Sequence, residues 1–134
     1  GAAKNLSNWA FKGSEGEVLT EVKDLILHCI ENKKPIVSLC ISPTLIAKSL
    51  EGSAHHPLLS LGTNSEKSEY NITEIHKAIS SVGATAVNKS IKEICIDENL
   101  RIISAPCYMM DAKVDEIYAN TKMAIDKLSD FLKN

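Results

Sequence analysis

The sequence has no apolar run that approaches the roughly 18 to 20 residues needed to cross a bilayer. It has no basic surplus, because 15 Lys and Arg stand against 17 Asp and Glu, and its N-terminus lacks a basic-then-apolar signal pattern. We therefore expect a cytoplasmic protein with neither membrane nor nucleic acid as partner. The 134 residues are 44% hydrophobic and 24% charged, which excludes disorder and collagen and is enough for one globular domain.

The cysteines and histidines lack the spacing of a disulfide frame or a metal site. The four cysteines form no C-x-x-C pair and follow no regular interval, so they are interpreted as reduced thiols: Cys29, Cys40, Cys95 and Cys107. His28 has no ligand-type partner one helical turn away, and His76 is expected at a solvated helix edge. We expect no metal ion and no cofactor.

The first half of the chain predicts a helix, a strand and a second helix. Ser14-Glu15-Gly16-Glu17 has the form of a capping box, which predicts that a helix begins there. Apolar residues at three- and four-residue steps continue that helix to about Lys33. The β-branched run 36–39 fits a strand buried on both faces, and Ser42-Pro43 opens a helix from Thr44 to about Leu50.

The second half predicts shorter strands between two further helices. Its expected elements are a brief strand at 58–61 within a mostly irregular stretch 51–70, a helix capped by Asn71 and stopped at Gly83, a strand at 85–87, a hairpin of 94–96 and 100–103, and a helix from about Asp111 to Leu132. This order indicates a layered α/β fold, and no repeat or linker divides it, so we expect a single domain over residues 1–134.

The most informative stretch is Ser38-Leu39-Cys40-Ile41-Ser42, between the predicted strand and helix. A nucleophile elbow needs a sharp turn at this junction, with small residues two positions before and after the nucleophile. The elbow would hold the Cys40 thiol at the positive end of a helix, where its pKa is lowered, and the Ile41 N–H would face a developing oxyanion. The same pattern also fits Cys40 as a small apolar residue at the end of a buried strand.

Three segments together resemble the ElbB family of glyoxalase-like proteins: Gly1-Ala-Ala-Lys-Asn-Leu-Ser7, the strand and elbow from Pro35 to Pro43, and the stretch Asp97 to Pro106 followed by Tyr108-Met109. That family belongs to the class I glutamine amidotransferase-like superfamily, with PfpI-type peptidases and the parkinsonism-associated deglycase. The resemblance implies a flavodoxin-like three-layer sandwich with a mostly parallel sheet, usually dimeric, in which Cys40 is the nucleophile.

The resemblance also implies that this chain is the C-terminal portion of its domain. In these relatives the segment that matches Gly1 follows a Pro-Gly-Gly loop deep in the fold, so the N-terminal part would be absent from this chain. That part would carry the Glu that hydrogen-bonds the cysteine and shuttles protons, and the Gly-Gly loop that completes the oxyanion hole. The missing N-terminal segment is therefore an expected partner.

Two departures from the superfamily narrow the expected chemistry. Ile41 stands where PfpI types have a histidine, so a Cys-His peptidase dyad is not supported. The pocket histidine of the deglycase branch would fall at residues 60–63, which contain none, and His55 and His56 are expected to be loop residues. Cys107 follows Pro106 at a strand end, where it would contact substrate, oxidise with Cys40, or serve only in packing.

The expected function is that of a glyoxalase-type lyase, which converts small dicarbonyls such as glyoxal to hydroxy acids through Cys40 and without glutathione. The implied partners are a small aldehyde substrate and a second copy in a homodimer. Since the proton-shuttling Glu would be missing, we expect the 134-residue chain alone to be inactive. The alternative is a non-enzymatic redox sensor or interaction protein in which Cys40 is oxidised.

Overall fold

The N-terminal segment, for which the sequence analysis predicts no element, forms two short helices in the computed structural model. The model describes residues 2–133, so the mid-fold position expected for Gly1 lies outside the described residues. Helices α1 (Ala2–Leu6) and α2 (Trp9–Lys12) lead into the 3-10 helix η1 (Gly13–Glu15). The indole of Trp9 is buried and belongs to one of two apolar core clusters, so it anchors this segment to the rest of the fold.

The capping box predicted at Ser14 is wrong. Helix α3 (Thr20–Glu31) begins six residues later, after Leu19, whose side chain offers no hydrogen bond. The Glu17 N–H instead donates to the Asn8 side-chain oxygen at 2.5 Å, and Ser7 pairs with Val18 in an isolated bridge. These bonds to a distant segment hold residues 17–18 in extended backbone, and a local capping motif does not overcome them.

The strands form a small mixed sheet and a separate parallel pair. In the first sheet the order is β1 (Ile36–Leu39), β5 (Ile102–Ala105), β4 (Cys95–Asp97), with β1 parallel and β4 antiparallel to β5. Strands β2 (Leu58–Gly62) and β3 (Thr85–Asn88) pair with each other in parallel. The mostly parallel single sheet that the resemblance implies is therefore not clearly present.

Side chains connect the two sheets where a backbone ladder would otherwise run. The Leu58 N–H donates to the Asp97 carboxylate at 2.9 Å, and the Ser60 N–H donates to the Ser104 hydroxyl at 3.0 Å. Because these N–H groups are already paired, β2 lies against β4 and β5 without sharing main-chain bonds with them. The result is two short sheets in one layer.

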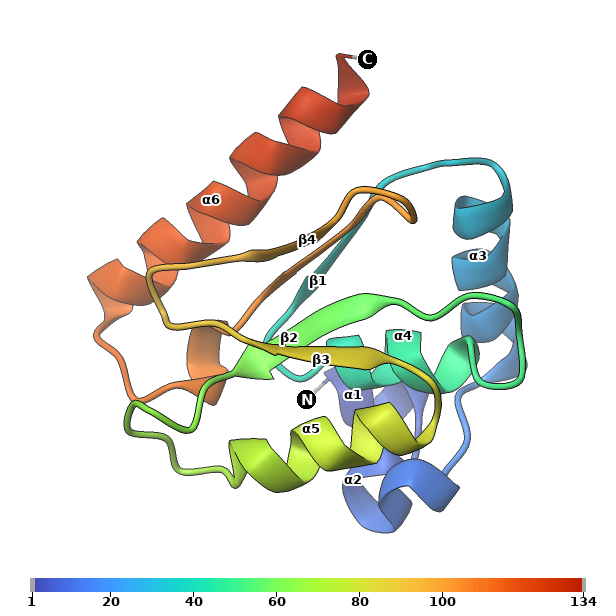
Figure 1. Cartoon of the computed structure of the whole chain (residues 1–134), viewed down its shortest axis with the longest axis horizontal. Coiled ribbons are helices and arrows are strands. Elements are labelled where there is room, and N and C mark those ends of the chain that lie inside the picture. Colours follow the sequence, from blue (N-terminus) through green and yellow to red (C-terminus); the bar gives the residue numbers. More distant parts are fainter. Residues whose placement is uncertain (1, 134) are drawn as a thin grey trace.

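Helices cover this layer on two sides (Figure 1). Helix α6 (Val114–Leu132) packs on β1 and β5, while α4 (Pro43–Ser49) and α5 (Ile72–Ser81) pack on β1, β2 and β3, with α3 against α4. One core cluster lies between the strands and α3, α4 and α5, and the other lies beneath α6 and the 3-10 helix η2 (Cys107–Met109). The layered α/β class is confirmed, and within residues 2–133 no helix combines the length and apolar character of a membrane span.

Candidate functional site

The predicted elbow is present at the junction of β1 and α4. Cys40 has φ +60°, a left-handed conformation that is uncommon for a residue with a side chain. The hydroxyl oxygens of Ser38 and Ser42 lie 2.7 Å apart across the turn, and the Ser42 hydroxyl donates to the Leu39 carbonyl at 2.8 Å. The two small residues that the elbow pattern requires are thus in contact, which closes the turn beneath Cys40.

Cys40 lies at the wall of a cleft with a volume of about 530 Å³. Helices α1 and α2 form one side, and the elbow, α4, α5 and η2 form the others. The cleft residues are Ala3, Lys4, Ser7, Trp9, Ala10, Cys40, Ile41, Thr44, Leu45, Tyr70, Ile75 and Met109. Most of these side chains are apolar, which suits a small organic molecule held beside one reactive sulfur.

The pKa of the Cys40 thiol is raised above its ordinary value, contrary to the lowering expected from the elbow. Burial of the sulfur is the largest cause, and the neighbouring Cys107 thiol adds to it. The backbone N–H groups of Ile41 and Tyr108 donate to the sulfur and act in the opposite direction. Helix α4 has only seven residues, and its dipole does not offset the cost of desolvating a thiolate.

The second N–H donor, that of Tyr108, is the main site feature that sequence reasoning missed. Tyr108 lies in η2, which is fixed from α6: the Cys107 N–H donates to the buried Asn120 side-chain oxygen at 2.9 Å. The Asn120 amide in turn donates to the Glu93 carbonyl at 2.8 Å. The parallel pairing of β1 with β5 brings residues 40 and 107–108 together at the ends of the two strands, and no local sequence pattern indicates that pairing.

Comparison with known proteins supports the fold. The structure is similar to the crystal structure of an isoprenoid biosynthesis protein with an amidotransferase-like domain from Ehrlichia chaffeensis. The match covers 98% of the present chain and 55% of the Ehrlichia chain, with a TM-score of 0.80 and 25% sequence identity. This chain has the class I glutamine amidotransferase-like fold. No protein-family model matches it.

Two curated relatives share the same region of this amidotransferase-like chain. The rat ES1 protein homolog, mitochondrial, is 27% identical over 96% of this chain and 47% of its own length. The human glutamine amidotransferase-like class 1 domain-containing protein 3, mitochondrial, is 29% identical over 88% of this chain and 43% of its own length. The chain therefore spans about half the length of the curated relatives it matches.

Cys107 lies next to Cys40 but is not one of the residues that line the cleft of this amidotransferase-like domain. It is buried, has φ +47°, and its sulfur lies 3.5 Å from the Thr121 hydroxyl. Cys40 packs against the core cluster that contains Cys107, so the two thiols are neighbours. Packing and oxidation with Cys40 both agree with this position, and contact of Cys107 with substrate stays a prediction.

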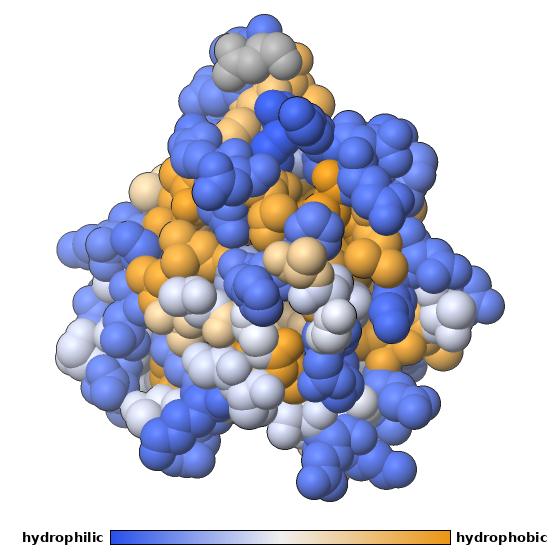
Figure 2. Space-filling view, turned by 45° about the vertical axis from the view of Figure 1, so that its right-hand side comes forward, coloured by the Kyte–Doolittle hydropathy of each residue, from blue (hydrophilic) through white to orange (hydrophobic). Residues whose placement is uncertain are grey.

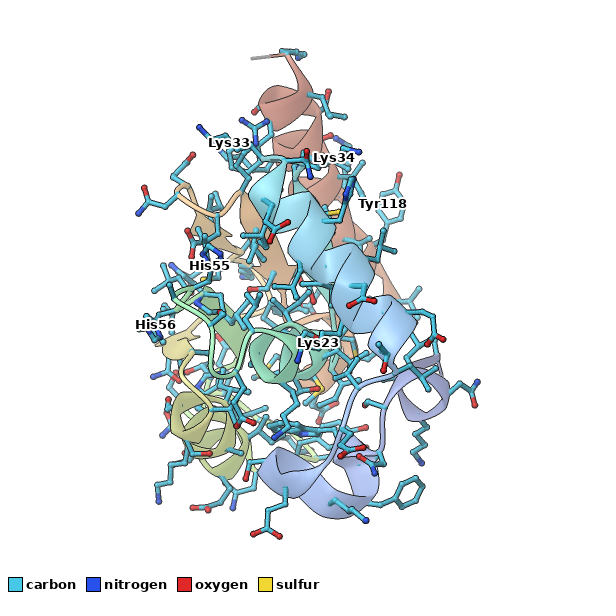
Figure 3. The ribbon with its side chains drawn as sticks, turned by 90° about the vertical axis from the view of Figure 1, so that its right-hand side faces the viewer. Lys23, Lys33, Lys34, His55, His56 and Tyr118 are labelled. Carbon is cyan, nitrogen blue, oxygen red and sulfur yellow. The ribbon has the colours of Figure 1, made fainter. Side chains whose placement is uncertain are left out.

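The histidines lie outside the cleft. His56 Nδ1 is 2.9 Å from the Gly83 carbonyl, and Figure 3 shows His55 and His56 together in their loop, as expected. His76 corrects the expectation of a solvated edge: it is buried, and its Nε2 accepts the Leu61 N–H at 3.0 Å. His28 bonds to Asn32 and Lys34 at the surface, and no metal-binding group of three His, Cys, Asp or Glu occurs among residues 2–133.

The cleft lacks a side chain that could serve as a proton acceptor at neutral pH. Among its described residues there is no Asp, Glu or His, and Lys4 is the charged one. The site as described therefore contains a half-buried thiol and two N–H donors without a side chain that could act as a general base.

Proposed function

We propose that this amidotransferase-like chain carries the nucleophile of a cysteine-dependent glyoxalase, a lyase that acts on glyoxal and similar small dicarbonyls without glutathione. The observation that carries the proposal is the half-buried Cys40 on a φ +60° elbow, facing an apolar cleft and held by two backbone N–H groups. Such a turn keeps a nucleophile in a strained conformation that the fold must sustain.

In this reaction the Cys40 sulfur attacks one aldehyde carbon of glyoxal and forms a hemithioacetal, whose oxygen gains a negative charge. We propose that the Ile41 and Tyr108 N–H groups, which act to lower the pKa of Cys40, stabilise charge on the sulfur before attack and on the oxygen after it. A base then removes the hydrogen from that carbon, and a proton is returned to the neighbouring carbon, which leaves a thioester. Water cleaves the thioester, releases glycolate and restores the thiol.

The raised pKa of Cys40 makes this base essential. Burial favours the neutral thiol, so attack at neutral pH needs a group that accepts the sulfur proton. The described cleft residues supply no carboxylate, and we propose that it comes from the N-terminal segment that the ElbB resemblance implies. The 134-residue chain alone would then be inactive, and a complex of it with a polypeptide that supplies the carboxylate would turn over glyoxal.

The test follows ¹³C-labelled glyoxal by NMR and measures labelled glycolate. We expect glycolate from the complex with the carboxylate-supplying polypeptide and none from the same complex of the Cys40→Ser variant. Cys29→Ser is the matched control, because Cys29 is half-buried on α3 and does not line the cleft. Glycolate formation at an unchanged rate by Cys40→Ser would exclude the proposal.

A redox sensor is the second candidate, and the closeness of Cys40 and Cys107 favours it. Hydrogen peroxide would oxidise the Cys40 thiolate to a sulfenic acid with release of water, and the Cys107 thiol would displace a second water to give a disulfide. For this function we expect the intact mass to fall by two hydrogens after peroxide treatment, and the Cys107→Ser variant to show no such loss. These results, together with the absence of glycolate formation, would support the redox sensor over the glyoxalase.

Location and assembly remain predictions. The cytoplasmic location expected from the sequence is not tested by the fold, and the two mammalian relatives are described as mitochondrial proteins. The homodimer implied by the resemblance is likewise a proposal.

A further inference from the structure

A polar groove lies beside β3, at the other edge of the strand layer from Cys40. Strand β1 pairs with β5, the Ser60 N–H on β2 donates to the Ser104 hydroxyl on β5, and β2 pairs with β3. The groove has a volume of about 380 Å³ and is lined by Asn64, Thr73, His76, Lys77, Ser80, Ala86 and Asn88. It shares no lining residue with the Cys40 cleft, so a ligand held there is separate from the chemistry proposed for Cys40.

The β2–α5–β3 unit brings these polar residues together. Four of them recur at steps of three and four residues on α5, which places them on one face of that helix: Thr73, His76, Lys77 and Ser80. Ile75, on another face of α5, lines the Cys40 cleft instead. Asn64 follows the end of β2, and Asn88 ends β3. Because open α/β sheets bind ligands at the carboxyl ends of their parallel strands, these two amides lie at a common position for a ligand.

His76 supplies a fixed hydrogen-bond donor to the groove. The ring is 9% exposed, and its Nε2 accepts the Leu61 N–H, so Nε2 carries no hydrogen. Burial lowers the pKa of His76, which keeps the ring neutral with its hydrogen on Nδ1. Within residues 2–133 this Nδ1–H has no acceptor, and Nδ1 is not sealed from solvent. The N–H is therefore open to the groove that the ring lines.

The groups around His76 add further free donors. The Lys77 ammonium pairs with Glu74 at 3.0 Å, but exposed pairs of this kind contribute little to stability, so the ammonium can turn to a ligand. The side chains of Ser80 and Asn88 are exposed and have no hydrogen-bond partner within residues 2–133. The residues that line the groove include no Asp or Glu. Donors and one positive charge thus prevail, which favours an anionic ligand.

The groove has room for a small molecule in polar surroundings. Its volume equals that of about a dozen waters at about 30 Å³ each, and α5 rises about 10 Å from Thr73 to Ser80. Figure 2 shows largely blue and white atoms over the lower part of the molecule, the height at which α5 lies in Figure 1, with most of the orange above it. A polar ligand with several hydrogen-bonding groups suits this groove better than an apolar one.

We propose that the groove binds a small hydroxylated anion through its carboxylate or phosphate group. The His76 Nδ1–H and the Lys77 ammonium bond to the anionic oxygens, and the Ser80 and Asn88 side chains bond to the hydroxyl groups. The bond from Leu61 holds the His76 ring in place, so this donor is oriented before the ligand arrives. The inference does not depend on the proposed reaction, because it uses no residue of the Cys40 cleft.

The test adds three matched molecules to the chain: glycerate, glycerol phosphate and glycerol. They carry a carboxylate, a phosphate and no charge on similar hydroxylated three-carbon frames. NMR at about pH 7.5, where His76 is neutral, and at constant ionic strength follows the His76 ring nitrogens and the Leu61 amide. We expect a saturable shift of the Nδ1 signal with glycerate, with glycerol phosphate or with both, and none with glycerol. A response to one anion alone identifies the ligand as a carboxylate or a phosphate.

Two lysine variants test the placement of the ligand. Lys77→Gln should weaken binding of the anion at least fivefold, because it removes the positive charge that faces the ligand. Lys122→Gln is the matched control, since Lys122 is also exposed and forms an ion pair within its own helix, with Asp126 on α6, outside the groove. The control should bind like the wild type. The inference is overturned by no saturable shift with either anion, by an equal response to glycerol, or by the same affinity in both variants.

Discussion

Single side chains decide the local geometry around Cys40. The Ser38 and Ser42 hydroxyls close the elbow, and Asn120 on α6 holds the η2 turn from which the Tyr108 N–H reaches the sulfur. Truncating Asn120 would leave the Cys107 N–H and the Glu93 carbonyl without buried partners, and each such loss costs about 1–3 kcal/mol. The site is thus supported by a residue that touches no part of the cleft.

His76 gives a prediction about the pH dependence of stability. Burial lowers the pKa of His76, and its neutral Nε2 accepts the Leu61 N–H. The unfolded chain therefore binds a proton on His76 more readily than the folded chain does. The neutral His76 contributes its full stabilisation of the fold above the unfolded pKa of about 6.5, and this contribution is lost as the pH falls from there toward the lowered pKa of the folded state. His76→Gln keeps an acceptor and removes the titration.

Urea unfolding at about pH 7 and about pH 5 measures this effect, and one proton corresponds to at most about 1.4 kcal/mol per pH unit. We expect the free energy of unfolding to fall more in the wild type than in His76→Gln. The exposed His56 offers the control, and His56→Gln should follow the wild type. Equal losses in the wild type and His76→Gln would show that His76 does not titrate differently in the fold.

The residue scale also shows what sequence could predict about the site. Cys40 and the Ile41 N–H were predictable because an elbow is a local pattern of five residues. The Tyr108 N–H and the direction of the Cys40 pKa were not, since both depend on η2 and on burial by elements far along the chain. His76 was misplaced for the same reason: its acceptor role depends on a strand that precedes its helix.

At the scale of elements, the predicted helix boundaries are correct where the capping contact is local in sequence. Asn71 caps α5 as predicted, with the Glu74 N–H donating to its side chain at 3.1 Å, and α5 ends before Gly83 at φ +103°. The predicted start of α3 is wrong because the Asn8 side chain and the Ser7–Val18 bridge hold the residues before the helix in extended backbone. All the predicted strands form, but their grouping into two sheets depends on Asp97 and Ser104, which no periodicity reveals.

The Asn71 cap provides an element-scale prediction. Asn71→Ala should lower the free energy of unfolding by about 1 kcal/mol, because the Glu74 N–H loses its acceptor. Asn71→Asp retains an acceptor and should stay close to the wild type. Urea denaturation of the three proteins checks this, and an alanine variant as stable as the aspartate variant would mean that the cap does not stabilise α5.

At the scale of the whole molecule, the site lies at the end of β1, an outer strand of the small mixed sheet. The chain spans about half of its curated relatives, its described cleft has no general base, and within residues 2–133 the strand that ends at Cys40 pairs on one edge only. They are the observations behind the proposal that a small aldehyde is held at Cys40 and that a general base from outside the described cleft residues completes the site.

The measurement that tests this account most directly is protection of individual thiols by glyoxal. Alkylation rates of Cys40 and Cys29 in the same chain are followed by peptide mass spectrometry, with and without glyoxal, at a pH above the ordinary thiol pKa of about 8.5, where hydroxide accepts the sulfur proton and no protein base is needed. Both thiols are half-buried, and Cys40 alone of the two lines the cleft. The account predicts that glyoxal slows alkylation of Cys40 several-fold more than that of Cys29; equal slowing at both thiols, or none at Cys40, would contradict it.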